Sequence, residues 1–255
     1  MQRQVNTSPG SIAILGARLR GGRIETDGAL AEHRAAIDDE RILIFRGAFD
    51  PAEMVSLRRA VQAWGEATDE FPRGKSASIP GINFHRRDDG TAPTSMPHIF
   101  HQFAFADLAS VPAGLAARLR TISTALLDFQ NELAGTRFEL EGDAFRTKVM
   151  RHPRGGGFLV RHRHPYLPQR VSLFLNLSEP GVDYSSGGVS YRSKGAWIET
   201  FAEFRSGDIL AWRYDLIHDV RPVDPNDTLK WEGDDGFWIY ALEMEEVHKA
   251  SNVTQ

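Results

Sequence analysis

The chain has 255 residues, of which 41% are hydrophobic and 25% charged, and its formal net charge is −4. We expect one domain over residues 1–255, without an electrostatic preference for nucleic acid or anionic membranes. The absence of cysteine excludes disulfides, zinc–thiolate sites, iron–sulfur clusters and a cysteine nucleophile. No apolar run approaches the roughly 20 residues of a membrane span, and no signal peptide is recognisable, so we expect a cytoplasmic protein.

Two elements near the start of the chain can be predicted from pattern. The segment "RILIFRG" (Arg41–Gly47) is typical of a short buried strand. Asp50 comes shortly after it and can cap a helix that begins at Pro51. The apolar positions of this helix recur at spacings of three and four: Met54, Leu57, Val61 and Trp64.

A second, longer helix is expected to end at Gly135, a residue type that commonly terminates helices. Its apolar stripe comprises Leu115, Leu119, Ile122, Leu126, Phe129 and Leu133. Such a stripe is more typical of a core than of a cofactor site. Residues 1–140 are therefore expected to form a helix-rich scaffold and lid with a strand or two.

The connection between the two helices includes a polar, turn-rich stretch that contains histidines, Arg86–Phe103. Long connections of this kind are often lids or binding loops, and an ordinary surface loop is the alternative. Both interpretations stay open at this point.

The second half changes to short apolar runs separated by Gly, Pro and Asp. Strands are predicted near residues 145–151, 157–163, 170–178, 187–192, 196–201, 208–213, 217–223 and 236–244. This series is typical of a jelly roll or barrel-like double sheet. We expect a mainly β fold with flanking helices, whose jelly-roll core spans residues 141–245.

Three histidines of this half form a candidate metal site. His162 and His164 are separated by one residue at a predicted strand end, so both imidazoles point to the same face. His218 lies on a later strand that a barrel can bring alongside. Two ligands from one strand and a third from another are the arrangement of a facial metal site. A pair of histidines satisfied by water and backbone is the alternative.

The order of motifs around these histidines resembles the double-stranded β-helix iron(II)/2-oxoglutarate-dependent oxygenases, with a phytanoyl-CoA-dioxygenase-like character. The matching elements, from about Phe145 to Glu243, are His162, Gly187-Gly188, Gly207-Asp208, His218 and Pro222-Val223. The resemblance implies a double-stranded β-helix core, Fe(II), 2-oxoglutarate as cosubstrate, and dioxygen. It also implies oxidation of a small metabolite, by hydroxylation or related C–H functionalisation.

The sequence departs from the family pattern at the third ligand. His164 occupies the position of the usual carboxylate, which gives "HRH" in place of His-x-Asp. The resemblance therefore implies a site of three neutral imidazoles: His162, His164 and His218. Asp183 is the alternative carboxylate ligand, whereas Asp219 should point away from its neighbour His218 and Asp208 fits a structural turn.

A second departure concerns the cosubstrate anchor, because no arginine stands about ten residues after His218, where the family has a basic residue. Lys230 is the preferred candidate, and Arg213 and Arg221 are the other two. A lysine would hold a carboxylate as a point charge and not as a bidentate fork.

The family resemblance places the substrate over the metal, beneath the N-terminal half. The candidates for contacting it are Arg86, His98 and His101, and Arg146 or Lys148 on the first barrel strand. These positive and hydrogen-bonding groups indicate an anionic small-molecule substrate. The sequence indicates no oligomeric state.

Three functions of different classes fit these observations. The preferred one is a non-haem iron(II) oxygenase that uses 2-oxoglutarate. A second is a three-histidine enzyme without 2-oxoglutarate, either a dioxygenase that uses oxygen alone or a zinc hydrolase or hydratase, since three histidines with an open position also suit zinc. The third is a non-catalytic relative.

Overall fold

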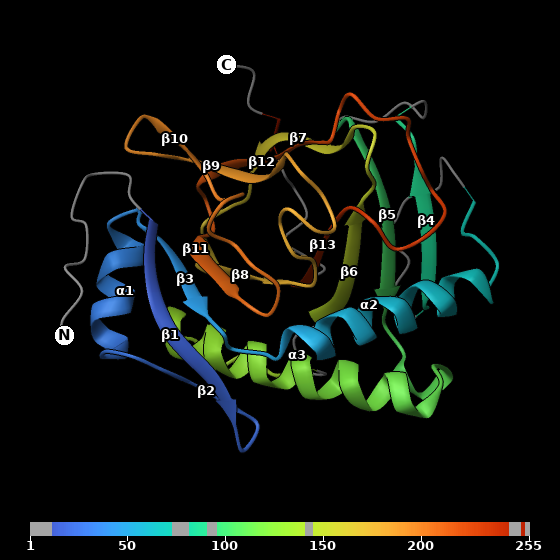
Figure 1. Ribbon diagram of the computed structural model, residues 1–255. Coiled ribbons are helices and arrows are strands. Elements are labelled where there is room, and N and C mark those ends of the chain that lie inside the picture. The colour runs from blue at the N-terminus through green and yellow to red at the C-terminus, as the bar shows by residue number, and fades with distance from the viewer. Residues whose placement is uncertain (1–11, 73–81, 91–95, 141–144, 245–250, 253–255) are drawn as a thin grey trace.

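The computed structural model describes residues 12–72, 82–90, 96–140, 145–244 and 251–252 (Figure 1). Its helices are α1 (Leu30–Asp38), α2 (Pro51–Glu66) and α3 (Ala113–Ala134), with a 3-10 turn at Leu108–Ser110. The strands before α3 are β1 (Ile12–Arg20), β2 (Arg23–Thr26), β3 (Ile42–Arg46), β4 (Phe84–Asp88) and β5 (His98–Phe105). Those after it are β6 (Phe145–His152), β7 (Gly157–Arg163), β8 (Val171–Asn176), β9 (Gly188–Ser193), β10 (Ala196–Glu199), β11 (Ile209–Arg213), β12 (Ile217–Val223), β13 (Phe237–Met244) and β14 (Ser251–Asn252).

The eight strands β6–β13 form two facing antiparallel layers. One layer has the order β10-β9-β12-β7, and the other has the order β6-β13-β8-β11. Strand β5 pairs with both β6 and β7 and so joins the layers along one side. All eight predicted strands are present within a few residues of their expected bounds. The predicted fold class, a mainly β jelly roll with flanking helices, is confirmed.

The first half contributes more strands than the sequence indicated. Strand β3 pairs with β11, β1 runs parallel to β3, and β2 closes this edge against β1. The expectation of only a strand or two was wrong. Strand β1 was missed because its residues are mostly exposed or half-buried in no regular alternation, as befits a strand near the edge of a sheet.

The expectation that Arg86–Phe103 is a connection was also wrong at both ends. Arg86 lies in β4 and Phe103 in β5, and the two strands pair with each other. Residues 91–95 of this stretch lie outside the described residues. The two strands were not predicted because their polar and charged side chains are typical of a loop. Arg86 and Asp88 are nevertheless buried here as an ion pair.

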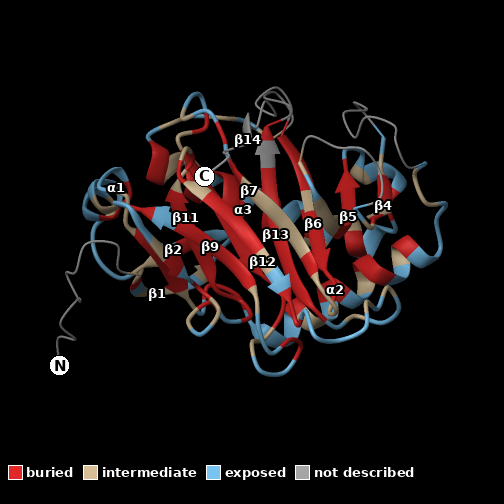
Figure 2. Ribbon diagram, turned by 90° about the horizontal axis from the view of Figure 1, so that it is seen from above, coloured by how far each residue is buried: buried red, intermediate tan, exposed pale blue. Residues whose placement is uncertain are grey.

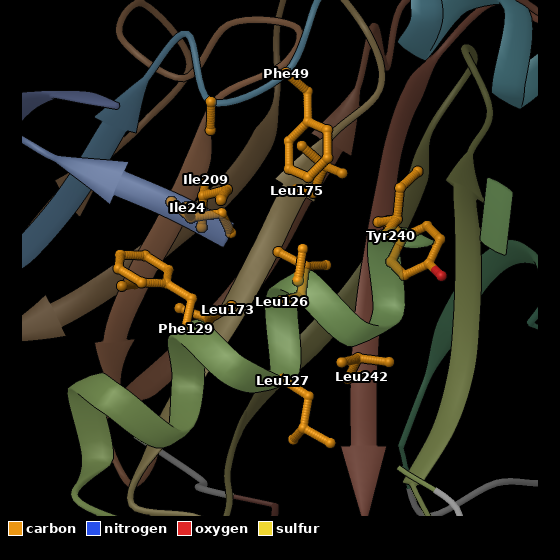
Figure 3. Close-up of a cluster of buried hydrophobic side chains, with 14 of the residues drawn as sticks. Ile24, Phe49, Leu126, Leu127, Phe129, Leu173, Leu175, Ile209, Tyr240 and Leu242 are labelled. Carbon is orange, nitrogen blue, oxygen red and sulfur yellow. The ribbon is translucent and has the colours of Figure 1, made fainter. Parts of the chain in front are cut away.

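The helices pack on the outer face of the β6-β13-β8-β11 layer, away from β7 and β12 (Figure 1). Helix α2 begins as expected, with the Asp50 carboxylate accepting a hydrogen bond from the Ala52 amide at 2.7 Å. Helix α3 ends at Gly135, whose φ of 66° is left-handed. Its apolar stripe, including Leu126 and Phe129, meets Leu173 and Leu175 of β8 (Figure 3).

A second apolar core fills the space between the two layers. It includes Phe174 and Trp212 from one layer and Tyr191 and Val220 from the other. Figure 2 shows that the central strands are mostly buried, whereas exposed residues gather in the connections and on the outer sides of the helices. Side chains that point inward from β7 and β12 therefore enter a largely apolar interior.

Candidate metal centre

The candidate centre is built on a cross-strand pair. His218, near the start of β12, lies opposite His162, near the end of β7, and their ring centroids are 4.2 Å apart. His164 comes directly after β7, and its ring centroid lies 5.0 Å from that of His162 and 5.4 Å from that of His218. Each histidine offers one nitrogen, and these nitrogens all lie within 4.8 Å of one another. The structure thus brings together the three predicted ligands.

Two of the imidazoles are held in the tautomer that a metal requires. Nδ1 of His162 lies 2.8 Å from the carbonyl oxygen of Val160, and Nδ1 of His218 lies 2.9 Å from that of Leu216. A carbonyl oxygen only accepts, so each Nδ1 carries the proton and donates it. The lone pair is then on Nε2, the ring atom that can coordinate a cation.

The third imidazole is positioned by an aromatic neighbour. The rings of His164 and Tyr214 are parallel within 2°, with centroids 4.5 Å apart. Tyr214 lies in the turn between β11 and β12, and its amide donates to the carbonyl of Arg170 at 2.8 Å. Tyr214 is buried and limits the movement of the His164 ring. No pattern in the sequence points to Tyr214, because turn residues carry no periodicity.

The carboxylates considered as ligands lie elsewhere. Asp183 accepts a hydrogen bond from the Arg58 guanidinium at 2.6 Å and another from the Glu179 amide at 2.7 Å. Asp219 pairs with the hydroxyl of Ser190 on the face opposite His218. Among the described residues, the histidine group therefore includes no carboxylate.

Asp208 has the structural role expected of it. Its carboxylate accepts from the amides of Gly47 and Arg205, at 2.9 Å and 3.0 Å, and from the Arg46 side chain. Burial raises the pKa of Asp208, although these hydrogen bonds and the charge of Arg46 act in the opposite direction. The carboxylate ties the turn before β11 to the end of β3.

The three candidate anchors for a cosubstrate carboxylate are not brought to the histidines. Lys230 is exposed in the connection after β12. This connection follows the end of β12 that pairs with Gly157, whereas His162 pairs with the opposite end. Arg213 forms ion pairs with Glu40 at 3.0 Å and Asp215 at 2.7 Å. Arg221 alternates with His218 on β12 and lies over the ring of Trp197, on the outer face.

The strand that follows β12 adds no cation from its inward face either. The inward residues of β13 that belong to the core between the layers are Phe237, Ile239 and Ala241. The predicted assignment of Lys230, Arg213 or Arg221 as anchor therefore has no geometric support. The sequence spacing misled because the connection after β12 runs to Gly236, so that Lys230 lies outside any strand.

Two of the candidate substrate residues form a buried cluster with Asp88. The Asp88 carboxylate lies 2.6 Å from Nε of Arg86 and 3.3 Å from Nε2 of His98. Burial raises the pKa of Asp88, but the contacts with His98 and Arg86 outweigh it, and the pKa is lowered. The cluster lies on the face of β4 and β5 that continues the inward face of β6.

Arg146 also lies on this inward face, and His101 does not. Arg146 extends from β6, with its guanidinium 5.9 Å from the centre of the Phe84 ring. His101 belongs to the opposite face, where its Nε2 lies 3.0 Å from Nδ1 of His85. Burial lowers the pKa of His101 to about 2, so it is a neutral core residue. The assignment of His101 to the substrate site was wrong, because strand alternation places its side chain on the opposite face of the sheet. There it contacts His85, which packs against Trp64 of α2.

Two aromatic residues of the inner core lie against the histidines of the candidate centre. The ring centroids of Tyr191 and Trp212 lie 5.8 Å and 5.7 Å from that of His218. Burial raises the pKa of the Tyr191 phenol well above its usual value. Both residues pack inside the barrel, but their closeness to His218 depends on cross-strand register. Strand alternation alone does not reveal it.

Comparison with known proteins shows which fold this is. No family model and no curated protein matches the sequence. A prolyl-4-hydroxylase of Pseudomonas putida is 15% identical over 85% of this chain and 100% of that chain, with a TM-score of 0.54. A dioxygenase for auxin oxidation in rice is 14% identical over 92% of this chain and 83% of that one, also with a TM-score of 0.54.

A third similar structure contains bound groups. The epimerase SnoN, in complex with Fe3+, alpha ketoglutarate and nogalamycin RO, is 14% identical over 88% of this chain and 86% of that chain, with a TM-score of 0.51. Within the described part of this chain, no helix is both long and apolar enough to cross a membrane. The predicted resemblance to the iron(II)/2-oxoglutarate oxygenase superfamily is confirmed as a likeness of fold.

Proposed function

We propose that this protein is a non-haem iron(II)-dependent oxygenase that uses 2-oxoglutarate and dioxygen to oxidise a small metabolite. The observation that carries the proposal is the convergence of His162, His164 and His218 between the two layers of a fold shared with such oxygenases. Imidazole nitrogens suit iron(II) and zinc, and in two of these three rings Nδ1 donates to a backbone carbonyl, which leaves the lone pair on Nε2.

The residues around the centre would hold the ion and limit the access of water. When bound, iron would supply dioxygen activation coupled to the oxidative decarboxylation of 2-oxoglutarate. His162 and His218 hold their rings in place through backbone carbonyls, and Tyr214 supports His164. The inward aromatic residues exclude solvent from one side of the centre.

The substrate would lie against the inward face of β4, β5 and β6. Arg86, His98 and Arg146 present a guanidinium or imidazole group on this face, which favours a carboxylate or another anionic group on the substrate. Asp88 offsets part of that charge and orients Arg86 and His98. The proposed substrate class is therefore a small molecule with an anionic group.

A zinc hydrolase or hydratase is the second candidate, because three neutral imidazoles with an open position form a known catalytic zinc set. Such an enzyme would use the ion to lower the pKa of bound water to about 7. Metal content distinguishes the two candidates, since the hydrolase would retain zinc and work without oxygen.

The test is anaerobic reconstitution with iron(II), followed by addition of 2-oxoglutarate. We expect one iron per chain and a weak visible charge-transfer band, and succinate when oxygen and a suitable anionic substrate are supplied. His162→Ala should lose iron while it keeps the circular dichroism spectrum of the wild type. Lys230→Ala is the matched control and should leave the band unchanged, because Lys230 lies away from the histidines.

Iron retained at full stoichiometry by His162→Ala would contradict the assignment of the centre. A wild-type protein that binds iron but gives neither the band nor succinate would exclude 2-oxoglutarate and favour an oxygenase that uses oxygen alone. Purified protein that holds zinc and hydrolyses or hydrates its substrate without oxygen would favour the second candidate.

A further inference from the structure

Two buried hydrogen-bond donors beside the centre have no acceptor among the described residues. The hydroxyl of Tyr191 and the indole N–H of Trp212 are enclosed, and neither has a hydrogen-bond partner among the described residues. Tyr191 is 0% exposed and Trp212 is 1% exposed. Buried donors are almost always satisfied in native proteins, so two neighbouring exceptions call for an explanation.

The two donors lie on either side of the interior, next to one metal ligand. Tyr191 on β9 pairs across the strands with His218, and Trp212 projects from β11 in the facing layer. Their ring centroids are 5.0 Å apart, and each ring contacts His218. An acceptor that reached both donors would therefore lie beside the metal.

The charge of the centre indicates what kind of acceptor fits. Three imidazoles bring no negative charge, so a divalent ion would keep its full charge in a buried place. Asp183, Asp208 and Asp219 are engaged elsewhere. A carboxylate from outside would offset the charge, and an ionised carboxylate only accepts hydrogen bonds.

We propose that the three-histidine centre binds a carboxylate group, and that the Tyr191 hydroxyl and the Trp212 indole N–H donate hydrogen bonds to it. This inference rests on the proposed metal centre and deepens it. The carboxylate belongs either to a 2-oxo acid cosubstrate or to the substrate. The described residues of β13 and of the connection before it bring no cationic anchor to the site. The two neutral donors take the place of that anchor.

The experiment uses the full chain loaded with cobalt(II) under anaerobic conditions, so that the visible spectrum reports metal binding and carboxylate binding separately. Wild type, Tyr191→Phe and Trp212→Phe are titrated with 2-oxoglutarate, succinate and acetate. We expect each substitution to weaken carboxylate binding by about tenfold or more, as loss of a hydrogen bond to a charged group does, with unchanged cobalt affinity.

Tyr240→Phe is the matched control. Tyr240 is also buried, but it lies on the outer face of β13 with its hydroxyl bonded to Ser123 and to the Leu119 carbonyl. This variant should lose thermal stability and keep wild-type carboxylate affinity. Tyr191→Phe should show the opposite pattern. It should lose no stability without ligand, because the removed hydroxyl has no partner among the residues that the structure describes, and its melting temperature should rise less when carboxylate is added.

The outcomes separate this inference from the proposed function. A wild-type protein that binds no cobalt overturns the metal centre itself. Cobalt binding with no carboxylate binding, or equal carboxylate affinity in Tyr191→Phe, Trp212→Phe and wild type, overturns this inference and leaves only a bound water as the acceptor. If the donor variants lose affinity, much tighter binding of 2-oxoglutarate than of succinate identifies a chelating 2-oxo acid, whereas similar affinities identify a simple carboxylate.

Discussion

Replacing His164 by alanine tests the unusual third ligand. Loss of a residue that merely supports a metal ligand typically costs 10–100-fold in metal affinity, so loss of one of three direct ligands should cost more than about 100-fold. His164→Asp should bind iron(II) more tightly than His164→Ala, because a carboxylate returns a ligand and adds attraction to the cation. Aspartate is shorter than histidine, so full recovery is not expected.

Asp183→Ala is the control, since Asp183 is the alternative ligand. Its carboxylate lies 2.6 Å from the Arg58 guanidinium, and the Arg58 side chain is only 4% exposed. Removing the partner of a buried charge costs about 3–5 kcal/mol, and we expect the lower end because Asp234 also lies 3.3 Å from Arg58. Asp183→Ala should therefore lose about 3 kcal/mol of unfolding free energy while iron affinity is unchanged.

Iron affinity is measured anaerobically by competition with a chromophoric chelator, and stability by urea unfolding of the metal-free protein. Wild-type affinity in His164→Ala, together with weak binding in Asp183→Ala, would refute the three-histidine centre. It would mean that Asp183 leaves Arg58 to complete the site.

Three further predictions follow from the packing. Tyr214→Leu should weaken iron binding by about 10–100-fold, and Tyr214→Phe should not, because the ring and not the hydroxyl stacks on His164; the same chelator competition checks both. The pKa of His101 falls from 6.5 to about 2 on folding, so the unfolded chain binds more protons between these values. Unfolding free energy should therefore fall by up to about 1.4 kcal/mol per pH unit as the pH drops below 6.5, and His101→Gln should show a shallower slope in urea titrations. Leu126→Ala should cost about 2–5 kcal/mol of unfolding free energy in the same assay, since Leu126 is 1% exposed beneath the sheet (Figure 3).

The sequence predicts the barrel well, because its strands are short, apolar and separated by Gly, Pro and Asp. The same reasoning identified both amphipathic helices and their ends at Asp50 and Gly135. It failed for α1, β1 and β2, and for β4 and β5. Of the residues of β1 only Ala13 is buried, and the polar side chains of β4 and β5 have the composition of a loop.

The closeness of the three histidines was predictable for a similar reason: His162 and His164 share a face by alternation, and His218 matched the position of a later family motif. Tyr191, Trp212 and Tyr214 could not be placed beside it, because their contacts depend on register between distant strands. Spacing along the chain also failed for the anchor. Lys230 lies at the right distance in sequence from His218 but beyond the far end of β12.

The central claim is that one metal ion is bound by His162, His164 and His218. The most direct test is a crystal of the iron(II)-loaded protein, grown anaerobically, with anomalous diffraction recorded on both sides of the iron absorption edge. The account predicts a single strong peak per chain at about 2.1 Å from one nitrogen of each of the three histidines. A peak that omits His164 and includes a carboxylate, or no peak between these residues, would contradict it.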